Sequence, residues 1–170
     1  MSDWVFPSVE AKPEGDPGLG EGPTVWVDAD ATPRAVKDVL FAVSDRRNLR
    51  LVFVANSWMR LPNSHLIRFI QVADGPDEAD NFIAERAVRG DLVITQDVPL
   101  AARVVPKDVA VIQPSGRRLD QDSINEALAL RDFKESLRDA GTMTGGPPPF
   151  GSKQKQAFSN ALDKWSTRVC

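Results

Sequence analysis

Cysteine and histidine are nearly absent from this sequence of 170 residues, which excludes two classes of site. With Cys170 as the single cysteine, neither an internal disulfide nor a cysteine-based zinc site can form. The single histidine, His65, lies in a polar segment and has no partner that would indicate a Ser-His-Asp arrangement. We therefore expect no disulfide partner and interpret His65 as a surface residue.

Long apolar runs and an excess of positive charge are also absent. No stretch approaches the roughly 20 apolar residues that span a bilayer, and the N-terminus lacks a signal-peptide core. A net charge of −3 argues against non-specific coating of nucleic acid, although a local basic patch is compatible with it. These features predict a soluble, cytoplasmic protein without a membrane partner.

Proline, glycine and acidic residues dominate residues 1–23, which carry no sustained periodicity and are predicted to be a disordered leader. The remaining residues, 24–170, are long enough for one ordinary domain with a hydrophobic core. We therefore predict a single folded domain that begins at about Thr24.

Short apolar runs alternate with helical patterns in the first two thirds of this domain. The expected strands are "VWV" (25–27), "RLVFVAN" (50–56), "IRFIQV" (67–72), "DLVIT" (91–95) and "VAVIQP" (109–114). The expected helices cover about 33–46, 77–89 and a short segment after Pro99, whereas residues 57–66 are expected to be mostly loop. This alternation predicts an α/β fold with a doubly wound parallel sheet.

Two longer helices are predicted after Pro114, over 121–140 and 152–168, and they should pack on this α/β core. Phe158, Leu162 and Trp165 form an apolar stripe that should dock the last helix on the sheet or on the preceding helix. The Gly/Pro-rich segment "GTMTGGPPPFG" between them lacks the lysine and spacing of a P-loop.

The stretch "VWVDADATP" (25–33) ends a buried strand in two carboxylates. Pro33 suits the first turn of a helix and Thr32 is a competent N-cap, so neither aspartate is needed to cap the helix. If the chain stays extended, Asp28 and Asp30 project on the same side, outside the carboxyl end of the strand. In open α/β sheets, ligands bind at that position.

Three further places present carboxylates. In "GPDEADNF", Asp77, Asp80 and Asn81 share one helical face; Asp77 is interpreted as a cap, whereas Asp80 lies too far inside the helix to cap it. Asp91 lies at the amino end of its strand and is interpreted as a turn residue. Asp97, with Thr95, follows the fourth strand and could equally cap the next helix.

Carboxylates that converge at one edge repel each other at neutral pH, and a hard divalent cation with oxygen ligands is the usual counter-charge. We therefore predict that Asp28, Asp30, Asp80 and Asp97 form a catalytic cluster for Mg²⁺ or Mn²⁺, in one or two ions. Such a site can activate water for attack on a phosphodiester. RNA is the predicted partner, while protein partners and oligomeric state are left open.

The motifs "VWVDADATP", "ADN" (79–81), "GDLVITQDVPLA" (90–101), "RDF" (131–133) and "TGGP" (144–147) resemble the bacterial YaiI/YqxD family, which looks like an offshoot of the PIN-like nuclease superfamily. The position after "DADA" is often cysteine in that family and is Thr32 here. The resemblance implies a Rossmann-like three-layer parallel sheet with an acidic Mg²⁺- or Mn²⁺-binding edge for RNA cleavage. It also implies metal ligands at Asp28, Asp80 and Asp97.

Other residues receive predicted roles around this cluster. Asp30 would orient a metal-bound water, and Asn56 or Thr95 would bind a phosphate oxygen or a metal-bound water. The cations expected to contact phosphates are Arg60 and Arg118, with Arg68 and Arg117 as further basic residues.

Two alternative functions remain open at this point. One is a non-catalytic RNA- or protein-binding domain. The other is an aspartyl phosphatase of the haloacid-dehalogenase type, because "DADAT" fits its D-x-D-x-T motif. That enzyme needs a lysine and a later acidic pair, but no lysine occurs between Lys37 and Lys107 and no acidic pair follows "VAVIQP".

Overall fold

A computed structural model describes residues 22–75, 77–139 and 151–169 of the chain. Most of the predicted leader, and all but the last residue of the segment "GTMTGGPPPFG", lie outside these described residues. The elements in chain order are β1 (Thr24–Asp28), the 3-10 turn η2 (Ala29–Ala31), α1 (Arg34–Arg47), β2 (Arg50–Ala55), β3 (Ile67–Gln71), α2 (Glu78–Arg86), β4 (Leu92–Ile94), α3 (Val98–Val104), η3 (Val105–Lys107), β5 (Ala110–Ile112), β6 (Arg118–Leu119), α4 (Ile124–Asp139) and α5 (Ser152–Val169).

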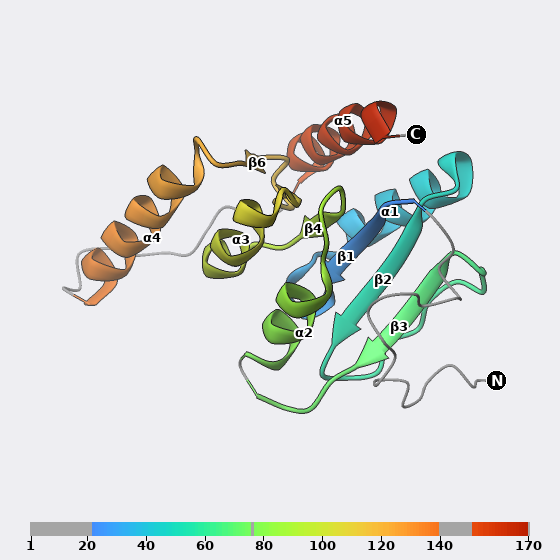
Figure 1. Cartoon of the computed structure of the whole chain (residues 1–170), viewed down its shortest axis with the longest axis horizontal. Helices are drawn as coiled ribbons and strands as arrows, with labels where there is room; N and C mark the ends of the chain where they lie inside the picture. Colours follow the sequence, from blue (N-terminus) through green and yellow to red (C-terminus); the bar gives the residue numbers. More distant parts are fainter. Residues whose placement is uncertain (1–21, 76, 140–150, 170) are drawn as a thin grey trace.

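The strands form one sheet in the order β3-β2-β1-β4-β5-β6. Every pairing is parallel except that of β5 with β6. Figure 1 shows the arrowheads of β1, β2 and β3 pointing to the same edge of the sheet. The predicted α/β class with a Rossmann-like parallel sheet is therefore confirmed.

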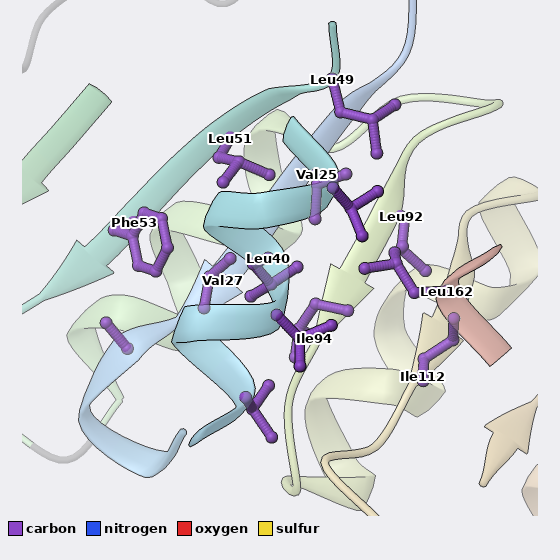
Figure 2. Close-up of a cluster of buried hydrophobic side chains, with 14 of the residues drawn as sticks. Val25, Val27, Leu40, Leu49, Leu51, Phe53, Leu92, Ile94, Ile112 and Leu162 are labelled. Carbon is purple, nitrogen blue, oxygen red and sulfur yellow. The ribbon is translucent and has the colours of Figure 1, made fainter. Parts of the chain in front are cut away.

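Helices cover both faces of the sheet and form three layers. Val25 and Val27 of β1 face a core that includes α1 and α5, whereas Trp26 faces α2, α3 and the start of α4. Figure 2 shows Leu40 of α1 and Leu162 of α5 over side chains from the central strands. Successive residues of β1 are buried on opposite faces, which explains its unbroken apolar sequence.

The last helix docks on the sheet and α1, one of the two predicted arrangements. Phe158, Leu162 and Trp165 are buried in the core that α1 shares. An ion pair of 3.0 Å between Arg46 and Asp163 adds a contact between α1 and α5. The prediction that this stripe packs is confirmed.

Two details differ from the sequence predictions. The helix expected over 77–89 ends at Arg86, because the backbone N–H of Val88 donates to the Asp91 carboxylate and turns the chain toward β4. The two-residue strand β6 was not predicted, since it is too short to carry a pattern and depends on a turn at Gly116, where φ is +93°. Residues 57–66, between β2 and β3, contain no helix, as expected.

Candidate functional site

The first strand lies at the point where the chain changes direction across the sheet. β1 pairs with β2 on one side and β4 on the other, and helices α1 and α2, which follow β1 and β3, cover opposite faces. Such a topological switch point is where open α/β sheets bind ligands. Asp28, at the end of β1, and Thr95, directly after β4, therefore lie where the fold favours a site.

Asp28 is buried, with 7% of its surface exposed, and Thr95 is more deeply buried still. The Thr95 hydroxyl donates a hydrogen bond of 2.9 Å to Asp28 Oδ2 and accepts one of 2.9 Å from the Asp97 backbone N–H. Thr95 therefore positions both acids. This geometry favours a positioning role over the predicted contact of Thr95 with a phosphate oxygen.

Burial is the largest cause that raises the pKa of the Asp28 carboxyl above its ordinary value. The hydrogen bond from Thr95 opposes this rise, while the nearby charges of Asp97 and Asp30 add to it. Because the negative charge of Asp28 is disfavoured by its surroundings, a cation at this edge would stabilise it.

Asp97 is the N-cap of α3, and its Oδ1 accepts the Leu100 backbone N–H at 3.0 Å. The capping interpretation of this residue is thus confirmed. The bond orients the carboxylate at the beginning of α3, beside Asp28 and Asp80. Asp97 can cap its helix with one oxygen and still contribute to a site.

Asp80 lies in α2, half-buried, and forms a hydrogen bond with Asp97. Two carboxyl groups can share such a bond only when one holds a proton. Burial raises the pKa of Asp80 to about 7, and the Asp97 bond, followed by the charges of Asp97, Asp28 and Asp77, also raises it. Carboxylates from β1, α2 and the α3 N-terminus thus lie near one another at one edge.

Asp30 is separated from this group by the local backbone. The chain does not stay extended after Asp28 but forms the 3-10 turn η2, so the expected side-by-side projection of Asp28 and Asp30 is wrong. Asp30 is exposed, and its Oδ2 accepts the backbone N–H of Asn56 at 3.0 Å, just beyond the end of β2. It lies near the cluster, as its effect on Asp28 indicates, but is held by the neighbouring strand.

Thr32 does not cap α1, contrary to the prediction. Its hydroxyl donates to the Asp28 backbone carbonyl at 2.8 Å, while Pro33 is the N-cap residue of α1 and makes no side-chain cap bond. Because η2 turns the chain first, Thr32 closes that turn instead of the helix.

Two other predicted caps or turn residues also differ. Asp77 is at the N-cap position of α2 but makes no side-chain cap bond. Asp91 is more than a turn residue: its buried carboxylate accepts hydrogen bonds from Thr24 N, Trp26 Nε1 and Val88 N, each 3.0 Å long. Asp91 ties the amino ends of β1 and β4 together, opposite the candidate site.

The predicted phosphate-binding residues are spread along the edge. The Asn56 side chain accepts from Ser57 Oγ at 3.2 Å and is close to Asp30 through its backbone. Arg60 lines a cavity against α1, while Arg118 in β6 is opposite the end of β5 and borders a smaller cavity. The structure does not bring these cations into contact with the Asp28 group.

The remaining polar residues have local roles. Arg117 forms a 3.9 Å ion pair with Glu126, and His65 is exposed as expected. Arg103 donates to Asn81 Oδ1 at 2.7 Å, a link between α3 and α2 that the sequence does not reveal. Lys107 donates to the Ala84 carbonyl of α2 at 2.8 Å.

No group of three or more His, Cys, Asp or Glu side chains is arranged to hold a metal ion in residues 22–75, 77–139 and 151–169. In the same ranges, no helix is long and apolar enough to cross a membrane. The metal roles of Asp28, Asp80 and Asp97 therefore stay predictions.

The topology and its acidic edge define a Rossmann-like α/β protein with carboxylates at the topological switch point. A family model described as "Uncharacterized BCR, YaiI/YqxD family" matches residues 26–168, and the chain belongs to this family. The family predicted from the five motifs is thus confirmed, while membership of the PIN-like superfamily stays a prediction.

Relatives named UPF0178 protein cover most of the chain. One from Xanthomonas campestris pv. campestris is 47% identical over 152 residues, which are 89% of this chain and 93% of the relative. One from Cellvibrio japonicus is 48% identical over 85% of this chain and 96% of its own length. One from Bordetella petrii is 51% identical over 82% of this chain and 93% of its own length. No solved structure matches the chain.

Proposed function

We propose that this protein is a Mg²⁺- or Mn²⁺-dependent phosphodiesterase that cleaves RNA at the carboxyl edge of its sheet. The observation that carries the proposal is the proximity of three acids from separate elements: Asp97 raises the pKa of both Asp28 and Asp80, and Asp28 raises that of Asp80. Asp80 and Asp97 can form their hydrogen bond only if one of the two carboxyl groups is protonated. A bound cation would neutralise their charges instead, so that both groups could be ionised.

The donor chemistry fits a hard cation. Carboxylate oxygens are the ligands that Mg²⁺ and Mn²⁺ prefer, and Mg²⁺ often binds one or two carboxylates together with waters and substrate phosphates. A partial protein site of this kind is compatible with the lack of a three-ligand group among the described residues. Asp80 and Asp97 would hold the ion together with Asp28, and the ion when bound would lower the pKa of water and stabilise the leaving oxygen.

The side chains of the chain would prepare this edge for a phosphodiester. Thr95 keeps Asp28 and Asp97 in fixed positions through its two hydrogen bonds. Asp28 Oδ1 has no hydrogen-bond partner within the described ranges, so it is free to accept a ligand. Asp30, held by Asn56, would accept a hydrogen from an attacking water that approaches from the β2 side.

Calorimetric titration of Mn²⁺ and Mg²⁺ into the full chain tests the metal before a substrate is known. We expect saturable binding that Asp28→Asn abolishes and Asp45→Asn retains, because Asp45 is exposed near the C-terminal end of α1, away from the site. Cleavage of labelled structured and single-stranded RNA is then measured with Mn²⁺ and with EDTA. An Asp28→Asn protein that cleaves as fast as wild type would contradict the mechanism.

A non-catalytic binding domain is the second candidate, and the lack of a three-ligand group among the described residues favours it. In that case, Asp28→Asn would leave RNA affinity unchanged or raise it by removing repulsion of the phosphates. Wild-type protein would show no metal-dependent cleavage of any RNA.

A further inference from the structure

A cavity of about 530 Å³ lies between the N-terminal half of α1 and residues 59–62, the segment that follows β2. Three of its lining residues are cations, Arg34, Lys37 and Arg60. Asp38 is the one acidic residue that lines it, so positive charge is in excess. We name this feature the α1 groove; it does not belong to the acidic cluster described above.

Two cations of the α1 groove have no ion-pair partner among the described residues. Arg34 and Arg60 are exposed, and neither guanidinium makes a hydrogen bond or an ion pair within the part of the chain that the structure describes. Lys37 is half-buried in the same groove, and burial lowers its pKa, opposed by the charge of Asp30. Pro33, the N-cap residue of α1, makes no side-chain cap bond, and Arg34 is the first helical residue. These features would all stabilise an anion bound in the groove.

An exposed tryptophan directly precedes the segment that lines the α1 groove. Trp58, with 70% of its surface exposed, is followed directly by Met59, which lines the groove. Indole rings are usually buried, and an exposed one offers a flat face for stacking. Single-stranded nucleic acids bind to this combination of cations that contact phosphates and an aromatic ring that stacks on a base.

The α1 groove lies near the acidic edge of the sheet through Asp30. Asp30 accepts the backbone N–H of Asn56, two residues before Trp58, and also acts electrostatically on Lys37. Asp30 therefore connects the groove to the carboxylate cluster. A strand that runs along the groove would lead from its cations to the proposed site of cleavage.

We propose that the α1 groove binds single-stranded nucleic acid, with phosphates at Arg34, Lys37 and Arg60 and one base stacked on Trp58. A paired base is not available for this stacking, so a duplex binds more weakly. This inference rests on the proposed function for its choice of a phosphodiester strand, but its test does not need cleavage.

Fluorescence anisotropy with a labelled oligouridine of about 12 nucleotides, in EDTA, measures binding alone. We expect Trp58→Ala to weaken binding by about 5- to 100-fold, because stacking on one base is lost, and Trp58→Phe to restore most of it. Phe133→Ala is the matched control, since Phe133 is an exposed aromatic residue of α4 outside the groove.

The cations are tested by the salt dependence of the same binding. The slope of log affinity against log salt concentration is negative. Arg34→Gln and Arg60→Gln should each make it shallower by about 0.7, the value for the loss of one phosphate contact on a single strand. Arg168→Gln, an exposed arginine of α5, should leave the slope unchanged. Wild type that binds no oligouridine, binds a duplex of equal length as tightly, or retains its affinity in Trp58→Ala would overturn the proposal.

The same assay separates this inference from the proposed function. Asp28→Asn should bind oligouridine at least as tightly as wild type. If wild type binds through the groove but never cleaves, the groove proposal stands and the phosphodiesterase proposal fails. If wild type cleaves RNA but the groove variants bind oligouridine normally, the phosphodiesterase proposal stands and the groove proposal fails.

Discussion

The hydroxyl of Thr95 donates a 2.9 Å hydrogen bond to Asp28 Oδ2 and thereby joins the carboxyl ends of β4 and β1. The same oxygen accepts the backbone N–H of Asp97, so one buried hydroxyl positions two acids of the candidate site. Substitutions at Thr95 and at the neighbouring carboxylates should separate this positioning from electrostatic and structural effects.

Replacing Thr95 with valine removes the hydroxyl and keeps the side-chain shape. Asp28 and the Asp97 N–H both lose their partner, and we expect the free energy of unfolding to fall by about 1–3 kcal/mol. Urea denaturation at neutral pH measures the change. Thr95→Ser, which keeps the hydroxyl, should lose clearly less; equal losses in the two variants would show that the hydrogen bonds are unimportant.

Asp80 should make the stability of the metal-free protein decrease with pH. Its pKa is raised from 3.8 to about 7, so the folded state holds a proton that the unfolded state releases. The stability from this proton is complete below the unfolded pKa and is lost as pH rises through about 7.

Asp80→Asn, which cannot ionise, should therefore unfold with a flatter pH profile and be more stable than wild type above that pH. After allowance for solvent screening of this half-buried group, we expect about 1–2 kcal/mol. Thermal unfolding in EDTA between pH 4 and 8 measures it, with Asp45→Asn as control. A wild-type profile parallel to that of Asp80→Asn would exclude the shared proton.

Asp28→Asn should separate stability from function. Burial raises the pKa of Asp28, so its charge costs stability at neutral pH, and the uncharged amide can still accept the Thr95 hydrogen bond. We expect unchanged or higher stability, by up to about 1 kcal/mol, together with loss of Mn²⁺ binding. Parallel chemical denaturation and calorimetry test this; strong destabilisation would indicate that Asp28 is needed for the fold.

Asp91→Asn should lower stability but leave Mn²⁺ binding unchanged, the opposite of what we expect for Asp28→Asn. The amide has one acceptor oxygen, whereas the carboxylate accepts three hydrogen bonds, from Thr24, Trp26 and Val88. We expect a loss of about 2–4 kcal/mol in the free energy of unfolding, since buried donors are left unpaired. Mn²⁺ affinity, measured below the unfolding transition, should stay near that of wild type because Asp91 lies at the opposite edge. Its loss would mean that the two edges are coupled.

Much of the fold was predictable because the relevant interactions are local. The apolar runs within 25–27, 50–56 and 91–95 are buried on both faces of the sheet. The helices between these strands indicate that the strands run parallel. Asp28 and Asp97 were placed at one edge on this basis alone, since parallel strands end on the same side. The stripe Phe158, Leu162 and Trp165 likewise indicated a packed last helix.

Other features depended on contacts between distant segments. The approach of Asp80 to Asp97 requires α2 and α3 to pack together, and the hydrogen bond from Thr95 to Asp28 spans two strands. Asp91 looked like a turn residue because its partners Thr24 and Trp26 are far away in sequence. Asp30 was misplaced because η2 turns the chain before α1 begins.

The sequence by itself determined the α/β class, the family and which strand ends carry acids, since periodicity and local motifs encode these properties. Tertiary structure decided that Asp80 approaches Asp97, that Asp91 ties the opposite edge together, and that Arg34, Lys37 and Arg60 line one groove. The physical reason is that burial, charge coupling and hydrogen bonding act through space, over distances that only the packed chain defines.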